Sequence, residues 1–216
     1  MSSAPTTTSL VLPGPAGNLE AVLDDPRQST DAAPSQVAVV CHPHPLFGGT
    51  MTNKVVHILA RTFNERGAPT LRFNFRGVGK SAGIHDDGQG ETEDVIAVLE
   101  WIRARWPHAT IWLAGFSFGA AMALRASQHG APPAALITVA PALRWLNQLA
   151  DAPECPWLIV QGDKDELVDA QAVQSWVSTL ARAPQLTLLA GAEHFFHGRL
   201  NDLRDVVREW LANRVA

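Results

Sequence analysis

Residues 110–126 read TIWLAGFSFGAAMALRA, and the interpretation of the whole chain starts from this stretch. Residues 110–114 form an apolar run that predicts a buried strand, and residues 120–126 form an alanine-rich run that predicts a helix. Between them, residues 115–119 match the pattern G-x-S-x-G, centred on Ser117. In a sharp strand-to-helix turn, small neighbours let the backbone close and the serine hydroxyl stands above the sheet. Ser117 is therefore the candidate nucleophile.

Strand and helix patterns alternate on both sides of this turn. Apolar runs predict strands at residues 9–12, 19–23, 37–41, 69–75, 135–140, 157–160 and 186–189. Apolar residues at helical spacing predict helices at residues 55–63, 91–106, 172–180 and 200–211. This alternation predicts an α/β fold, with a mostly parallel central sheet of about eight strands and helices on both faces.

The length of 216 residues fits a single domain over residues 1–216, and the small polar residues 1–8 are expected to be disordered. The N-terminus has neither a basic start nor an apolar run, so no signal peptide is expected. No apolar stretch is long enough to cross a bilayer. We therefore expect a cytoplasmic protein that does not bind membranes.

The charge and the cysteines exclude other classes of protein. A net charge of −4 and the lack of any Lys/Arg cluster argue against nucleic-acid binding. Cys41 and Cys155 both stand beside apolar strand-like runs, which is typical of buried free thiols and not of a disulfide framework.

A serine nucleophile needs a base, and histidine has a suitable pKa. His194 follows the last predicted strand, so its loop lies at the same edge of the parallel sheet as Ser117. His197, three residues later, is the rival candidate. We favour His194.

The base in turn needs a carboxylate to hold its tautomer. Asp163 and Asp165 follow the predicted strand at residues 157–160, and the order Ser, Asp, His along the chain suits this fold. Asp163 stands next to a glycine, where aspartate commonly stabilises a turn. Asp165 is therefore the candidate acid, with Asp163 second.

Two backbone N–H groups are expected to form an oxyanion hole. One is that of Phe118, directly after the nucleophile, and the other lies in the loop after residues 37–41. Pro43 and Pro45 have no N–H in that loop, which leaves His44 as first candidate and Leu46 as second. A metal site at His42 and His44 is disfavoured, because no ligand cluster follows at the required spacing. We expect no metal and no cofactor.

Five segments together resemble a known family. They are residues 42–51 (HPHPLFGGTM), 72–81 (RFNFRGVGKS), 114–119 (AGFSFG), 161–165 (QGDKD) and 193–197 (EHFFH). The chain resembles the small bacterial α/β serine hydrolases that lack a lid, and more distantly the dienelactone hydrolases. The resemblance implies the α/β-hydrolase fold and a triad of Ser117, Asp165 and His194. Dienelactone hydrolases use a cysteine nucleophile, whereas this chain has Ser117.

The expected activity is hydrolysis of small soluble acyl esters through an acyl-enzyme. Only about sixteen residues separate Ala140 from the strand at Trp157, which leaves little sequence for a lid. An apolar substrate pocket is expected from Leu46, Phe47, Trp145, Phe195 and Phe196. Thioesterase, peptidase and perhydrolase activities use the same serine chemistry and remain alternatives. A binding protein that keeps the fold without turnover is the alternative from another class.

Overall fold

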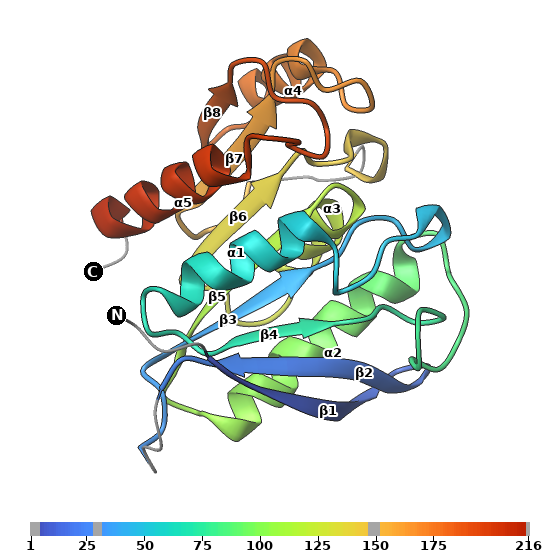
Figure 1. The fold of residues 1–216 in the computed structure, drawn as a ribbon. Coiled ribbons are helices and arrows are strands. Elements are labelled where there is room, and N and C mark those ends of the chain that lie inside the picture. The colour runs from blue at the N-terminus through green and yellow to red at the C-terminus, as the bar shows by residue number, and fades with distance from the viewer. Residues whose placement is uncertain (1–4, 28–31, 147–151, 215–216) are drawn as a thin grey trace.

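The computed structural model describes residues 5–27, 32–146 and 152–214, and its strands form one eight-stranded sheet (Figure 1). In chain order the strands are β1 (Thr6–Gly14), β2 (Gly17–Asp25), β3 (Gln36–Cys41), β4 (Thr70–Phe73), β5 (Thr110–Phe116), β6 (Ala135–Val139), β7 (Trp157–Gly162) and β8 (Gln185–Leu189). Across the sheet their order is β1-β2-β4-β3-β5-β6-β7-β8.

Strands β4, β3, β5, β6, β7 and β8 pair in parallel, while β2 is antiparallel to both of its neighbours. The central strands β4, β6 and β7 are buried at every position, as expected of strands covered on both faces. The predicted fold, an α/β-hydrolase sheet of about eight strands, is confirmed. Its parallel strands bring their carboxyl ends to one edge, where the functional loops lie.

Helices cover both faces of the sheet (Figure 1). The α-helices are α1 (Lys54–Asn64), α2 (Gln89–Arg105), α3 (Phe118–Ala126), α4 (Ala170–Ser178) and α5 (Leu200–Arg214), and the short 3₁₀ helices are η1 (Pro45–Phe47) and η2 (Leu143–Trp145). One core cluster joins α2, α3 and α4 to the sheet, and the other joins α1 and α5 to the opposite face. None of these helices, over the residues described, is long and apolar enough to cross a membrane.

The first strand corrects the expectation of disorder at residues 1–8. Residues 1–4 lie outside the described residues, but β1 begins at Thr6. Thr6 pairs with Asp25 across the hairpin, and the Thr7 hydroxyl donates to Asp24 Oδ1 at 2.6 Å. The β-branched threonines suit a strand, and pairing with β2 supplies the hydrogen bonds that the local sequence could not reveal.

Cys41 and Cys155 are buried free thiols, as predicted. Burial raises the pKa of both thiols, that of Cys155 to about 11. Both therefore stay protonated near neutral pH and contribute to packing, not to nucleophilic chemistry.

Candidate active site

The turn between β5 and α3 has the geometry of a strained strand-to-helix elbow. Ser117 adopts φ 55° and ψ −115°, a conformation that residues with side chains rarely adopt. A Cβ at Gly115 would stand 2.2 Å from the carbonyl oxygen of Gly119, and a Cβ at Gly119 would stand 2.3 Å from that of His42. Both flanking positions therefore require glycine, and the turn holds Ser117 at the carboxyl edge of the sheet.

His194 lies beside this serine. Its Nε2 is 3.1 Å from Ser117 Oγ, and its Nδ1 is 2.8 Å from Asp165 Oδ2. An ionised carboxylate only accepts hydrogen bonds, so Nδ1 carries the proton and Nε2 is free to accept one. The imidazole is buried, which fixes its orientation between the two partners.

Asp165 is held ionised by the groups around it. Burial alone would raise its pKa, but hydrogen bonds from His194 and from the N–H groups of Val168 and Leu167 outweigh burial and lower the pKa. The Leu167 and Val168 N–H groups donate to Oδ1 at 2.9 and 2.7 Å. The Gln161 side-chain amide donates to Oδ2 at 2.9 Å, a contact that the sequence analysis did not foresee.

The alternative acid and base lie elsewhere. Asp163 is exposed, and its Oδ1 accepts the Gly191 N–H at 2.6 Å, so it joins two neighbouring turns. The His197 side chain is 68% exposed and lies 3.5 Å from Glu193. Neither residue takes part in the contacts between Asp165, His194 and Ser117.

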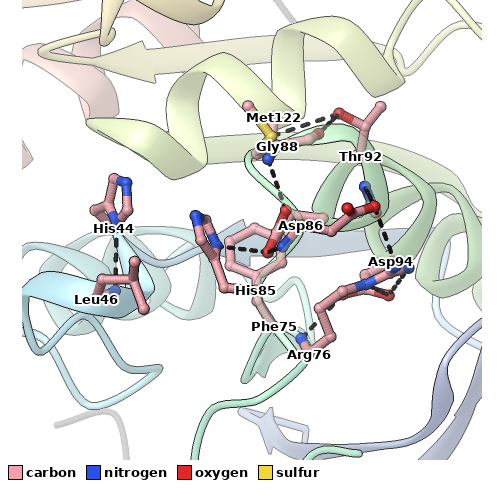
Figure 2. Close-up of polar contacts among 12 residues, drawn as sticks. His44, Leu46, Phe75, Arg76, His85, Asp86, Gly88, Thr92, Asp94 and Met122 are labelled. Atoms are coloured by element: carbon pink, nitrogen blue, oxygen red, sulfur yellow. Dashed lines mark hydrogen bonds and ion pairs between the residues drawn. The ribbon is translucent and has the colours of Figure 1, made fainter. Parts of the chain in front are cut away.

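Two backbone N–H groups near Ser117 are unused. Neither Phe118 nor His44 donates its backbone N–H to any other residue in the part of the chain that the structure describes. The Leu46 N–H, by contrast, donates to His44 Nδ1 at 3.2 Å (Figure 2). The geometry therefore favours His44 over Leu46 as the partner of Phe118 in the predicted oxyanion hole.

The buried side chain of His42 holds the loop after β3 in place. Its Nδ1 lies 2.6 Å from the Pro43 carbonyl oxygen, and its Nε2 accepts the Phe75 N–H at 3.0 Å. Complete burial lowers the pKa of His42 to about 4, so the ring is neutral at pH 7. With both nitrogens bound to backbone groups, His42 joins the loop after β3 to the end of β4.

The segment at residues 72–76, part of the family-like pattern, braces the same loop. Arg72 Nη1 donates to the Met51 carbonyl at 2.9 Å, and Asn74 Oδ1 accepts the Met51 N–H at 2.9 Å. Arg76 forms a buried ion pair with Asp94 of α2, at 2.8 Å (Figure 2). These arginines position loops around the site and do not face Ser117.

A cavity of about 390 Å³ opens beside Ser117 and His194. Of the predicted pocket residues, Phe47 and Trp145 line it. Leu46 and Phe195 do not line it, and they are 69% and 40% exposed.

Phe196 corrects the predicted pocket. It is fully buried in the core beneath α1 and α5, with a left-handed φ of 53°. In this turn adjacent side chains face opposite ways, Phe195 outward and Phe196 inward. A pair of neighbouring phenylalanines gives no signal in the sequence of which one faces solvent.

The sequence analysis missed most of the other cavity lining. The segment after β6 contributes Arg144 with two apolar neighbours, and the segment after Asp165 contributes Leu167, Val168 and Asp169. The second group was detectable, because apolar residues directly after the acid lie at the same edge of the sheet. Arg144 was detectable only as the neighbour of Trp145.

Comparison with known proteins gives consistent results. A family model described as "serine aminopeptidase, S33" matches residues 33–154. Two solved structures are similar over nearly the whole chain. XC6422 from Xanthomonas campestris, described as an α/β serine hydrolase without a lid, is 45% identical, with a TM-score of 0.89 over 96% of this chain and 94% of that one.

The second structure is an α/β serine hydrolase homologue from Coxiella burnetii. It is 43% identical, with a TM-score of 0.88 over 96% of this chain and 99% of that one. The uncharacterized protein RP471 from Rickettsia prowazekii is 32% identical over an alignment 210 residues long, which covers 92% of this chain and 86% of that protein.

Proposed function

The chain belongs to the lidless α/β serine hydrolases, and on that premise we propose that it hydrolyses small soluble carboxylic esters through an acyl-enzyme on Ser117. One observation carries the proposal: an unbroken series of contacts runs from Asp165 through His194 to Ser117. Such a series lets a hydroxyl, which is a weak nucleophile by itself, lose its proton as it attacks.

In the first half of the reaction, Ser117 Oγ bonds to the carbonyl carbon while His194 Nε2 takes the hydroxyl proton. Negative charge develops on the carbonyl oxygen, where the N–H groups of Phe118 and His44 would stabilise it. The bond to the leaving oxygen then breaks, and that oxygen takes the proton from His194. Asp165 stabilises the transient imidazolium.

In the second half, a water molecule attacks the acyl carbon and gives a proton to His194 Nε2. The bond to Ser117 Oγ breaks, the carboxylic acid leaves, and Ser117 regains its proton. The open, partly apolar cavity beside Ser117, over which no lid lies among the described residues, favours short acyl groups over long lipid chains.

The description of the matching family model makes an aminopeptidase the second candidate. Recognition of a free amino group needs an anionic side chain in the pocket. Asp169 lines the cavity, but its oxygens already accept the N–H groups of Gln171 and Ala172. Arg144, a cation in the same lining, would repel an ammonium group, so we favour the ester.

Activity profiling of the wild type against Ser117→Ala tests the proposal. The panel contains p-nitrophenyl esters, acyl-CoAs and Xaa-Pro amides, and a fluorophosphonate probe reports the reactivity of the serine. We expect turnover of short esters and probe labelling in the wild type, and loss of both in the variant. Ser178→Ala, an exposed serine on α4, is the matched control and should keep both.

Preference for acyl-CoAs would move the assignment to a thioesterase, and preference for amides to a peptidase. Formation of a peracid from a carboxylic acid and hydrogen peroxide would indicate a perhydrolase. An unlabelled Ser117 with no turnover would instead favour a binding protein of the same fold.

A further inference from the structure

Arg144 places a positive charge next to the candidate nucleophile. It belongs to η2, directly after β6, and lines the same cavity as Ser117 and His194. Its guanidinium carbon lies 3.5 Å from the centre of the Trp145 ring, which holds the planar group at the rim of the cavity. The side chain is exposed, so a ligand can reach it.

This cation has no carboxylate partner among the described residues, although ion pairs occupy many other arginines of the chain. Its polar contact within the protein is with a histidine, since Nη2 lies 3.1 Å from His44 Nε2. A guanidinium has five N–H donors, so the described part of the chain leaves most of its hydrogen-bonding capacity unused.

In the contact between Arg144 and His44, a hydrogen-bond donor lacks an acceptor. His44 Nδ1 faces the Leu46 N–H (Figure 2). His44 Nε2 faces the Arg144 guanidinium, so both ring nitrogens meet donors. Burial, His85 and Arg144 lower the pKa of His44, which keeps the ring neutral. A neutral imidazole accepts at only one nitrogen. Because Nδ1 accepts the Leu46 N–H, Nε2 carries the ring proton, and the Arg144 N–H that faces it lacks an acceptor there. An external acceptor at the rim would resolve this conflict.

We propose that Arg144 binds a carboxylate carried by the substrate, so that the preferred esters are anionic. The inference rests on the proposed ester hydrolysis. A planar carboxylate matches the fork of a guanidinium, which accepts it with two parallel hydrogen bonds. Arg144 supplies a single positive charge, and the carboxylate of Asp169 lines the same cavity. A singly charged carboxylate therefore fits better than a doubly charged phosphate.

Two pairs of substrates test the preference. The first pair is mono-p-nitrophenyl adipate and the neutral methyl ester of the same compound, which place the carboxylate on the acyl part. The second pair is 4-acetoxybenzoate and its methyl ester, which place it on the leaving group. The readout is the ratio of kcat/KM for the anionic member to that for the neutral member, measured in the wild type and in Arg144→Gln.

We expect Arg144→Gln to lower this ratio about tenfold for at least one pair, as loss of one charge-assisted contact predicts. In the wild type the ratio should also fall as salt screens the exposed pair. Arg208→Gln is the matched control: it removes the same charge from an exposed arginine on α5 and should leave both ratios unchanged.

Equal ratios in the wild type and Arg144→Gln for both pairs overturn the inference, while loss of neutral-ester turnover in Ser117→Ala still supports the proposed function. If no ester is hydrolysed, the proposed function fails. Calorimetric titration of monomethyl adipate into Ser117→Ala then still decides the inference. The inference is overturned if Ser117→Ala binds monomethyl adipate no more tightly than dimethyl adipate. It is also overturned if the double variant Ser117→Ala/Arg144→Gln binds monomethyl adipate as tightly as Ser117→Ala does.

Discussion

Asp163 and Asp165 stand two positions apart in one loop, and their surroundings give them different roles. Asp165 contacts the imidazole of His194, whereas Asp163 accepts a hydrogen bond from the Gly191 backbone. Asp163 and Asp165 are therefore a natural pair for a matched experiment, because their substitutions by asparagine change the same charge in the same loop.

We predict that Asp165→Asn lowers kcat for p-nitrophenyl butyrate by about 10³- to 10⁴-fold, because an amide N–H facing Nδ1 favours the wrong histidine tautomer. Asp163→Asn should change kcat by less than about threefold, because its amide oxygen still accepts the Gly191 N–H. Steady-state kinetics of the two variants measure the difference. Equal losses in both would remove Asp165 from its proposed role.

At the scale of elements, the loop after β3 is fixed by a neutral buried histidine. His42 is held between the Pro43 carbonyl and the Phe75 N–H, and burial lowers its pKa to about 4. In the unfolded chain the same group titrates near 6.5. Below pH 6.5 the unfolded state therefore binds a proton that the folded state refuses, and stability falls until the pH reaches the folded-state pKa.

We predict that His42 alone lowers the free energy of unfolding by ~3 kcal/mol between pH 7 and pH 4, with no contribution above pH 7. In His42→Gln this loss of the free energy of unfolding between pH 7 and pH 4 should be absent, while the glutamine amide oxygen can still accept the Phe75 N–H. Urea unfolding of both proteins across this pH range gives the difference. Parallel stability curves would contradict the assignment.

The start of α3 packs directly against the end of β3, with no room for a side chain at Gly119. We predict that Gly119→Ala lowers the free energy of unfolding by at least about 3 kcal/mol, because the colliding atoms are backbone and cannot rotate away. Gly67→Ala is the control: it has a positive φ of 82° but open space, and should cost only about 1 kcal/mol. Thermal or urea unfolding of the two variants measures both losses, and their difference separates the effect of the collision at Gly119 from that of backbone strain alone.

At the scale of the whole molecule, the site is open to solvent. Among its described residues, the segment between β6 and β7 contains a 3₁₀ helix of three residues, and the similar structure from Xanthomonas is described as lacking a lid. Enzymes that need a lid to open accelerate at a lipid surface.

We therefore predict that the rate of tributyrin hydrolysis rises smoothly through the solubility limit of the substrate. Titration with tributyrin at constant enzyme concentration, with p-nitrophenyl acetate as a soluble reference, makes the measurement. A jump in rate when droplets appear would show that some segment covers the site.

The parallel sheet and the turn at Ser117 were predictable because their signals are local: apolar runs, helical spacing and two flanking glycines. The shared edge at which the carboxyl ends of parallel strands meet narrowed the acid to Asp163 or Asp165 and the base to His194 or His197. The preference for His194 rested partly on the family resemblance.

The role of Gln161 and the buried position of Phe196 were not predictable, and Arg144 at the cavity was detectable only as the neighbour of Trp145. The Gln161 amide reaches Asp165 only because the loop after β7 folds back on itself over four residues. Phe196 lies in a turn that sends adjacent side chains in opposite directions, and Arg144 meets His44 from a segment a hundred residues away.

The backbone at Ser117, with φ 55° and ψ −115°, also has an evolutionary consequence. A residue with a side chain is strained there, and glycine is not. We predict that Ser117→Gly is inactive but has a free energy of unfolding about 1 kcal/mol higher than that of the wild type. Ser117→Ala should have the same free energy of unfolding as the wild type. Chemical denaturation of the three proteins makes the comparison. A descendant lineage released from selection for turnover would then drift toward glycine at this position, and a serine retained there marks a copy of the gene whose chemistry is still in use.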